Sequence, residues 1–291
     1  MNNIRSMLQY GVNELTRNGL PEPVIDTERI LCNVLSLEKY QLYINSDYDP
    51  GNYKTGIFKK YINQRLSRIP LAYILRKTEF MGIEFDIVPG VLVPRQETEL
   101  LAEQALDLIN KEYRHGKQIN IVDLCCGSGI IGLSILSKLN LRQFRVTVHF
   151  SDINPECIKL TRHNSEKLNL TEHAMLYNGD MYIPEEFAGR TDIIVCNPPY
   201  IKSTEIPGLQ PEISVHEPIN ALDGGTDGLK YYHKIAELSG KYLAADSGYL
   251  LVETGDSQLI EVSAVFSNAG FHNICGIKDY SGLDRIVKCS K

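Results

Sequence analysis

Four residues, Asn197-Pro198-Pro199-Tyr200, directly follow a short apolar run, DIIVC at 192–196. Two consecutive prolines cannot donate to a β-ladder and keep the chain extended, so a rigid segment is expected at the carboxyl edge of a sheet. There the Asn197 side-chain oxygen and the Pro198 carbonyl can both accept hydrogen bonds from one planar NH₂ group, and the ring of Tyr200 can stack on it. A Pro-Pro turn that merely ends a strand is the alternative, but packing gives little reason for the flanking Asn and Tyr. The motif predicts recognition of an amide or an aromatic amine.

A glycine-rich stretch follows another apolar run. The segment 122–129, VDLCCGSG, is expected to leave a buried strand and to open a helix. Gly127 and Gly129 let the backbone pass close to a ligand, and the helix presents free N–H groups to it. With Gly132 the spacing also fits G-x-G-x-x-G, so a dinucleotide-binding loop and a purely structural turn remain as alternatives. The residues expected to contact a nucleotide cofactor are Asp123, Cys125, Cys126, Gly127, Ser128 and Gly129.

Two further polar segments follow predicted strands. Asp152, next to Ile153, stands at the end of the second strand of the sheet, where its carboxylate can accept from both hydroxyls of a ribose. The alternative is an N-cap for the following helix. Asp180 could accept from an adenine amine and Met181 could lie on the base, although an ordinary Asn-Gly turn at 178–179 explains the segment equally well.

The elements that position these residues alternate strand and helix beyond residue 95, which predicts a mostly parallel sheet covered on both faces. Only a few residues separate the last two predicted strands, so they should form an antiparallel hairpin. This ending favours a methyltransferase-like, Rossmann-like α/β fold over a dinucleotide dehydrogenase. The predicted strands are 119–124, 145–151, 174–177, 192–196, 248–253, 271–277 and 284–289, and the predicted helices are 96–113, 129–139, 154–169, 227–244 and 256–268.

The first part of the chain has a different pattern. Apolar residues recur at helical spacing from residue 3 to about 75, with breaks at prolines, which predicts a small helical domain. The stretch TEFMGIEFDIV at 78–88 alternates around Gly82 and predicts a β-hairpin. We therefore expect a helical domain over 1–76, a hairpin linker over 77–94 and the α/β domain over 95–291.

Composition excludes several classes of function. The formal charge of −6, from 30 Lys+Arg and 36 Asp+Glu, gives no support to a protein that coats nucleic acid or an anionic membrane. The seven cysteines form no C-x-x-C pair, and no histidine has an i, i+4 histidine partner, so we expect reduced thiols, no metal and a cytoplasmic location. No apolar stretch is long enough for a spanning helix, and the first residues lack the apolar region of a signal peptide.

Taken in order, the motifs D-x-x-x-G-S-G, D-x-N-P, G-D and N-P-P-Y resemble the S-adenosylmethionine-dependent amino-methyltransferases, which include N6-adenine methylases and protein glutamine methylases. Residues 65–101, RLSRIPLAYILRKTEFMGIEFDIVPGVLVPRQETELL, resemble the linker region of the HemK/PrmC family of release-factor glutamine methyltransferases. So do Glu217-Pro218, Gly224-Gly225 and Asp227-Gly228-Leu229 after N-P-P-Y, and Gly270-Phe271 with Asp284-Arg285 near the end. The likeness covers nearly the whole chain.

The resemblance implies a seven-stranded class I methyltransferase domain that uses S-adenosylmethionine and yields S-adenosylhomocysteine. It further implies a helical domain that docks a class 1 peptide-chain release factor, whose Gly-Gly-Gln glutamine is methylated on its side-chain nitrogen (N5). Asn197, Pro198, Pro199 and Tyr200 would be catalytic and bind the substrate with Glu217, Asn197 would also contact the cofactor, and Arg95 and Glu97 would lie in a loop that closes over the site. The chain departs from the family at Arg76, commonly glycine, at Gln96, commonly proline, and at Cys125-Cys126-Gly127, commonly a Gly-Thr-Gly-type loop.

Two other functions compete with this interpretation. An N6-adenine methylase would use the same N-P-P-Y geometry but normally needs a basic recognition region, and the first 90 residues carry 11 Lys+Arg against 10 Asp+Glu. A paralogue could methylate another protein or small-molecule amide, and a regulatory protein could keep the fold without catalysis. We expect a monomer that forms no stable complex with nucleic acid or membrane.

Overall fold

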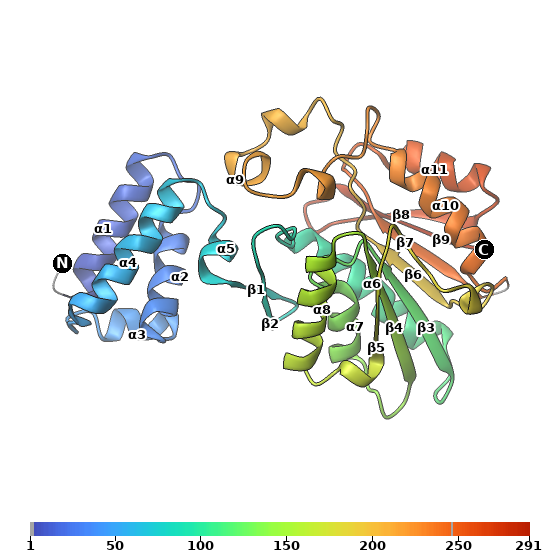
Figure 1. The fold of residues 1–291 in the computed structure, drawn as a ribbon, viewed down its shortest axis with the longest axis horizontal. Coiled ribbons are helices and arrows are strands. Elements are labelled where there is room, and N and C mark those ends of the chain that lie inside the picture. The colour runs from blue at the N-terminus through green and yellow to red at the C-terminus, as the bar shows by residue number, and fades with distance from the viewer. Residues whose placement is uncertain (1–2, 246) are drawn as a thin grey trace. The chain divides into compact units, whose positions relative to one another are not determined.

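A computed structural model describes residues 3–245 and 247–291 of the chain, which divides into two compact units. The first unit comprises the chain up to Lys77 together with Gln210–His216, and the second comprises Thr78–Leu209 and Glu217–Lys291. Figure 1 labels the helices and strands of both. Across the described ranges, no helix is both long and apolar enough to cross a membrane.

The first unit is helical, as predicted from its apolar spacing. Prolines and glycines separate the helices, since Pro23 is the first residue of α2 and Gly51 begins α4 with a positive φ of 78°. The helices surround a core of fully buried side chains that includes Ile4, Leu31 and Phe58. The helices of this unit are α1 (Ile4–Arg17), α2 (Pro23–Leu35), α3 (Lys39–Ile44), α4 (Gly51–Leu66), α5 (Leu71–Leu75) and α9 (Pro211–Ser214).

A buried ion-pair network joins the distant segment 210–216 to the other helices of this unit. Arg65 is 5% exposed; its Nε donates to Asp26 at 2.7 Å and its Nη1 donates to Glu212 at 2.8 Å. Burial would raise the pKa of Glu212, but the hydrogen bond and charge of Arg65 outweigh burial and lower it. Segment 210–216 therefore belongs with the first unit. Its ion pairs with Arg65 and Arg68 join residues over 140 positions apart, and such pairs leave no local pattern in the sequence.

Arg76 ends α5 in the left-handed backbone region, with φ 61° and ψ 20°. A side chain with a Cβ is strained there by about 1–2 kcal/mol, whereas glycine adopts this conformation readily. Glycine at this position, which the resemblance to the HemK/PrmC family implies, would therefore relieve the strain.

We expect Arg76→Gly to raise the free energy of unfolding by about 1 kcal/mol, since relief of the left-handed strain outweighs the entropy that glycine loses on folding. Urea denaturation of the purified protein measures the change. Arg76→Ala is the matched control, because alanine keeps the Cβ and should bring no such gain. A glycine variant no more stable than the alanine variant would contradict the explanation.

The second unit begins with a hairpin of β1 (Lys77–Phe80) and β2 (Ile83–Asp86). Its two turn residues, Met81 and Gly82, both have positive φ, at 52° and 71°, as a type I′ turn requires. The hairpin confirms the prediction for 78–88.

A seven-stranded sheet forms the centre of the second unit, with the strand order β5-β4-β3-β6-β7-β9-β8. The first five strands in this order are parallel, and β9 pairs antiparallel with both β7 and β8. The predicted mixed sheet with a C-terminal antiparallel hairpin is therefore confirmed. The strands are β3 (Gln118–Leu124), β4 (Arg145–Asp152), β5 (Ala174–Asn178), β6 (Ile193–Cys196), β7 (Tyr249–Glu253), β8 (His272–Lys278) and β9 (Asp284–Ser290).

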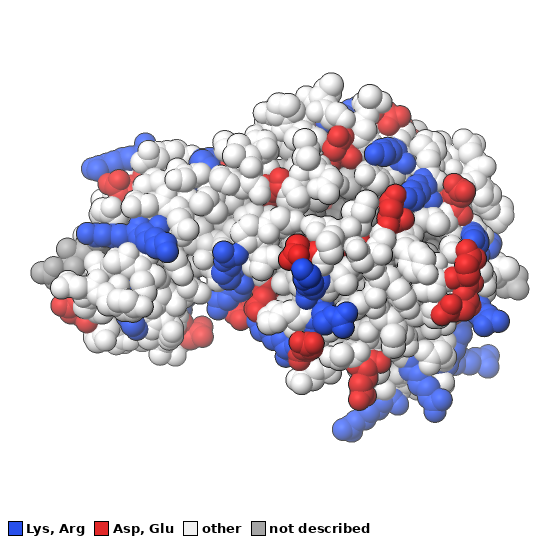
Figure 2. Space-filling model, viewed as in Figure 1, with Lys and Arg blue, Asp and Glu red and all other residues white. Residues whose placement is uncertain are grey.

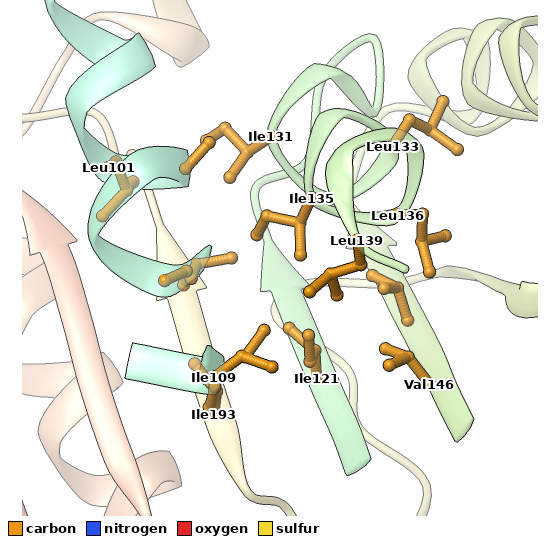
Figure 3. Close-up of a cluster of buried hydrophobic side chains, with 14 of the residues drawn as sticks. Leu101, Ile109, Ile121, Ile131, Leu133, Ile135, Leu136, Leu139, Val146 and Ile193 are labelled. Atoms are coloured by element: carbon orange, nitrogen blue, oxygen red, sulfur yellow. The ribbon is translucent and has the colours of Figure 1, made fainter. Parts of the chain in front are cut away.

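Alternate side chains of each strand point to opposite faces of the sheet. Both faces are apolar here, and helices cover each of them. On β3, Ile121 packs with α6 (Glu99–Glu112) and α7 (Ile130–Lys138), as Figure 3 shows. Val122 packs on the other face with α10 (Lys230–Tyr242) and α11 (Leu259–Asn268). The remaining helix, α8 (Pro155–Lys167), lies beside β4 and β5, and short 3₁₀ helices occur at Gln96–Thr98, Thr171–His173, Glu185–Phe187, Ile206–Gly208 and Ile219–Ala221.

Candidate active site

A pocket in the second unit brings together the segments that follow β3, β4, β5 and β6. Parallel strands present their carboxyl ends at one edge of the sheet, which is where ligands bind in open α/β folds. The residues that line the pocket are Gly90, Leu92, Pro94, Thr98, Cys125, Cys126, Gly127, Ser128, Ile130, Ile131, Asp152, Ile153, Asn154, Cys157, Asp180, Met181, Asn197, Pro199, Pro218, Asn220, Ala221 and Tyr231.

The glycine loop after β3 lines the pocket through Cys125, Cys126, Gly127 and Ser128. A Cβ on Gly127 would meet only Val91, at 3.9 Å, so the loop has open space on that side. A Cβ on Gly129 would instead meet the Thr161 side chain at 2.5 Å. Gly129 is therefore needed for close packing between α7 and α8, whereas Gly127 leaves room for a ligand.

Asp123 is the one predicted cofactor contact before the loop, and it is not a pocket-lining residue. Its side chain is completely buried, and Oδ2 accepts a hydrogen bond from the backbone N–H of Gly132 at 2.9 Å. Burial raises the pKa of Asp123 to about 7. In the structure this carboxyl group fixes the N-terminal turn of α7 and thereby the glycine loop.

Asp152 and Ile153, at the end of β4, both line the pocket. The two Asp152 oxygens accept backbone hydrogen bonds, Oδ2 from Gly127 and Oδ1 from Asn154, each at 2.9 Å. The N-cap of α8 is Asn154, whose Oδ1 accepts from the N–H of Glu156. The capping role considered for this segment thus falls to Asn154, and the Asp152 carboxylate retains acceptor capacity for a ligand.

Asp180 and Met181 line the pocket after β5. Met181 is buried with a positive φ of 53°, and Asp180 forms an ion pair with Lys234 at 2.5 Å. Lys234 belongs to α10, so this helix restrains the Asp180 side chain through the ion pair.

The N-P-P-Y motif begins at Asn197, the residue directly after the end of β6. Asn197 and Pro199 line the pocket, whereas Pro198 and Tyr200 do not. The Asn197 Nδ2 donates to the Thr98 hydroxyl at 3.2 Å, and the backbone carbonyl of Tyr200 accepts from Gln258 Nε2 at 3.0 Å. The motif is therefore held at both ends by side chains from other parts of the second unit.

Glu217, predicted to contact the substrate, is paired with Arg95. The Arg95 Nη2 lies 2.8 Å from both carboxylate oxygens, and the Glu217 side chain is 1% exposed. Burial raises the pKa of Glu217 more than Arg95 lowers it. This pair ties the segment around Arg95 to the residues after Glu217, of which Pro218 and Asn220 line the pocket.

Sequence reasoning did not assign several pocket residues to the site, of which Thr98, Asn154, Cys157, Asn220 and Tyr231 carry polar groups. Thr98 lies in PRQETE beside Arg95 and Glu97, and Asn220 lies three residues after Glu217, so both occur in segments that already pointed to the site. No spacing rule distinguished them from their neighbours.

Comparison with known proteins agrees with this fold and site. Residues 98–212 match a family described as "Methyltransferase small domain", and residues 6–75 match one described as "PrmC N-terminal domain". The fold is shared with the hMettl16 catalytic domain (TM-score 0.55, 17% identity, 79% of this chain and 81% of that chain). A methyltransferase from Pyrococcus furiosus is also similar (TM-score 0.50, 16% identity, 78% and 98% covered). Together the sheet, its carboxyl-edge pocket and these matches define a methyltransferase of class I fold.

Relatives along the full length identify the family. The chain is 38% identical over 263 residues to the release factor glutamine methyltransferase of Clostridium acetobutylicum, with 90% of this chain and 89% of the relative covered. It is 35% identical to that of Clostridium botulinum, with 99% of both chains covered. The chain belongs to the release factor glutamine methyltransferase family, also called PrmC or HemK.

Proposed function

We propose that this protein transfers a methyl group from S-adenosylmethionine to the side-chain amide nitrogen of the glutamine in the Gly-Gly-Gln motif of a class 1 peptide-chain release factor. The observation that carries the proposal is the placement of Asn197, fixed by Thr98, in the same pocket as the glycine loop and Asp152. One pocket thus holds a candidate amide-binding group beside a candidate nucleotide-binding group. Family membership supports the choice of acceptor.

The residues around the glycine loop fit S-adenosylmethionine. The Asp152 carboxylate keeps acceptor capacity for ribose hydroxyls, and open space faces Gly127. Asp180 and Met181 are available for the adenine. When bound, S-adenosylmethionine supplies an electrophilic methyl group on a positively charged sulfur.

The acceptor amide needs positioning because its nitrogen lone pair is delocalised and therefore weakly nucleophilic. Asn197 Oδ1 and the Pro198 carbonyl would accept the two amide hydrogens and turn the lone pair toward the methyl carbon. Methyl transfer would form the N–C bond as the S–CH₃ bond of S-adenosylmethionine breaks and leaves neutral S-adenosylhomocysteine. The acceptor nitrogen would become transiently positive and then release a proton to solvent. Carbonyl dipoles aimed at the nitrogen stabilise this charge more in the transition state than in the ground state.

Charge distribution argues against a nucleic acid as the acceptor. Over the face that Figure 2 shows, basic and acidic side chains are interspersed. With a formal charge of −6, the chain lacks the excess of cations that usually holds phosphates. A protein acceptor agrees better with this surface.

Methyl-labelled S-adenosylmethionine tests the proposal with three acceptors offered separately. They are a class 1 release factor from the same source, its variant with the tip glutamine replaced by alanine, and adenine-containing DNA and RNA. We expect label on the release factor and none on the variant. Label on nucleic acid would overturn the proposal, and label on neither would direct the search to other amides.

A further inference from the structure

Two fully buried polar side chains of α8 bind the backbone of the glycine loop. Thr161 and Asn164 are both 0% exposed, and their i, i+3 spacing places them on one face of the helix. The Thr161 hydroxyl donates to the Gly127 carbonyl at 3.1 Å. The Asn164 Nδ2 donates to the Ser128 carbonyl at 3.0 Å. Two consecutive carbonyl groups of the loop therefore point toward α8.

The partners of Asn164 fix the orientation of its side-chain amide. Besides the Ser128 carbonyl, Nδ2 donates to the main-chain carbonyl of Asp86 at 3.1 Å, and Oδ1 accepts from the Asp86 N–H at 3.0 Å. A carbonyl only accepts and an N–H only donates, so the two ends of the amide cannot exchange. Asp86 ends β2, and Gly90 shortly after it lines the pocket. Asn164 thus connects the glycine loop with a second wall of the same pocket.

The N–H groups of the loop differ in whether the protein satisfies them. Because a peptide bond is planar and trans, the Ser128 N–H points away from α8 when the Gly127 carbonyl points toward it. The Gly127 N–H donates to Asp152 at 2.9 Å. The Gly129 N–H donates to the Cys126 carbonyl at 2.8 Å. Among the described residues, no group accepts from the N–H of Ser128, which lines the pocket, so this donor is available to a ligand.

We propose that Thr161 and Asn164 are positioning residues for S-adenosylmethionine: they bind the two loop carbonyls on the α8 side and so present the Ser128 N–H to the carboxylate of the cofactor's methionine part. The inference deepens the proposed function and rests on it for the identity of the cofactor. A carbonyl turned into the pocket would repel that carboxylate, whereas an N–H forms a charge-assisted hydrogen bond with it. Because a glycine at 127 leaves the peptide group easy to turn, side chains have to fix it.

The carboxylate is the part of the cofactor that best fits this N–H. It is the one negatively charged group of S-adenosylmethionine, and Ser128 lies just before the first turn of α7, where the helix dipole favours an anion. The ribose hydroxyls already have a candidate acceptor in Asp152. A donor for the carboxylate therefore completes the set of contacts that the pocket offers.

Two Thr161 variants separate the hydroxyl from the packing around it. Thr161→Val keeps the shape but removes the hydrogen bond to Gly127, and we expect the Kd for S-adenosylhomocysteine to rise on the order of tenfold, about the contribution of one hydrogen bond to a charged group. Thr161→Ser keeps the hydroxyl and should bind as the wild type does. Calorimetric titration measures both. Equal losses of affinity in the two variants would overturn the inference, because packing alone would then explain them.

Methylthioadenosine separates an effect on the carboxylate from a general disturbance of the pocket. It keeps the nucleoside and the sulfur of the cofactor but lacks the carboxylate. We expect its Kd to be the same in the wild type and in Thr161→Val. If the Kd values of methylthioadenosine and S-adenosylhomocysteine rose by the same factor, the loss would belong to the whole pocket and the proposed role would be wrong.

Asn164→Leu tests the second side chain, with Ser165→Ala as its matched control. Leucine fills a similar volume without hydrogen bonds, and we expect the same selective loss of affinity for S-adenosylhomocysteine. Ser165 is also fully buried on α8, but its hydroxyl donates to the Arg162 carbonyl of the same helix at 2.7 Å. Its replacement should lower the thermal stability and leave both Kd values unchanged. A selective loss in Ser165→Ala would contradict the inference, and the Thr161 pair decides the question if Asn164→Leu does not fold.

None of these measurements uses an acceptor, so the inference and the proposed function can fail separately. Selective loss in Thr161→Val together with an unlabelled release factor would support the positioning role and count against the acceptor alone. Methyl transfer to the release factor together with an unselective loss would overturn the positioning role alone. A wild type that binds neither S-adenosylhomocysteine nor methylthioadenosine would overturn the positioning role together with the assignment of the cofactor.

Discussion

Replacement of Asn197 by alanine is expected to lower kcat by on the order of 10²-fold or more while the affinity for S-adenosylmethionine changes little. The reason lies in the weak nucleophilicity of a carboxamide, which leaves positioning to supply most of the rate. Positioning of two reactants in a near-attack geometry contributes roughly 7–11 kcal/mol. Alanine removes one of the two acceptors proposed to hold the amide and leaves Thr98 without its partner.

Steady-state kinetics with labelled S-adenosylmethionine, together with calorimetric titration of the cofactor, measure both parts of this prediction. Asn110→Ala is the matched control, because Asn110 is an exposed residue of α6 and its side chain bonds only to the Leu106 carbonyl among the described residues. The control should keep wild-type turnover. If kcat of Asn197→Ala were also unchanged, the amide-holding role would be excluded.

Asp152→Asn is expected to weaken S-adenosylmethionine binding by roughly 10²-fold, since two hydrogen bonds to a charged acceptor contribute about 1.5–3 kcal/mol each. Asparagine keeps the size of the side chain but replaces one acceptor oxygen with a donor NH₂ group. That NH₂ would also face one of the backbone N–H groups of Gly127 and Asn154, to which the aspartate now bonds. The loop beside the pocket would then lose part of its support.

Calorimetry with S-adenosylmethionine and with S-adenosylhomocysteine measures the loss, and thermal unfolding without ligand shows whether the fold is retained. Glu156→Gln is the control, because Glu156 is an exposed carboxylate four residues further along the chain, in the first turn of α8. Its affinity should equal that of the wild type. Undiminished affinity in Asp152→Asn would remove Asp152 from the cofactor site.

Motifs at the ends of strands could be placed from the sequence because their neighbours are regular. The apolar runs before Gly127, Asp152 and Asn197 predict parallel strands, and the carboxyl ends of such strands meet at one edge. The structure brings these three residues into one pocket, as expected. Glu217 was predicted to bind the substrate from resemblance alone. In the structure its carboxylate forms an ion pair with Arg95.

Asp123 illustrates what a motif leaves open. Its position before the glycine loop fits both a ligand contact and a structural carboxylate, and spacing is the same in the two cases. The structure places it out of the pocket, bonded to Gly132. The direction of a side chain on a strand decides such a case, and a shift of one residue reverses that direction.

The sequence by itself determined the class of fold, the order of helices and strands, the family and the strand-end segments that line the pocket, because alternation, helical spacing, turn residues and short motifs are local properties of the chain. Only the tertiary structure joined Arg65 to Glu212 and Thr98 to Asn197. The residues of each pair lie 99 positions or more apart along the chain. Hydrogen bonds between them depend on which strands are neighbours and which face each side chain occupies, and no local pattern of residues carries that information.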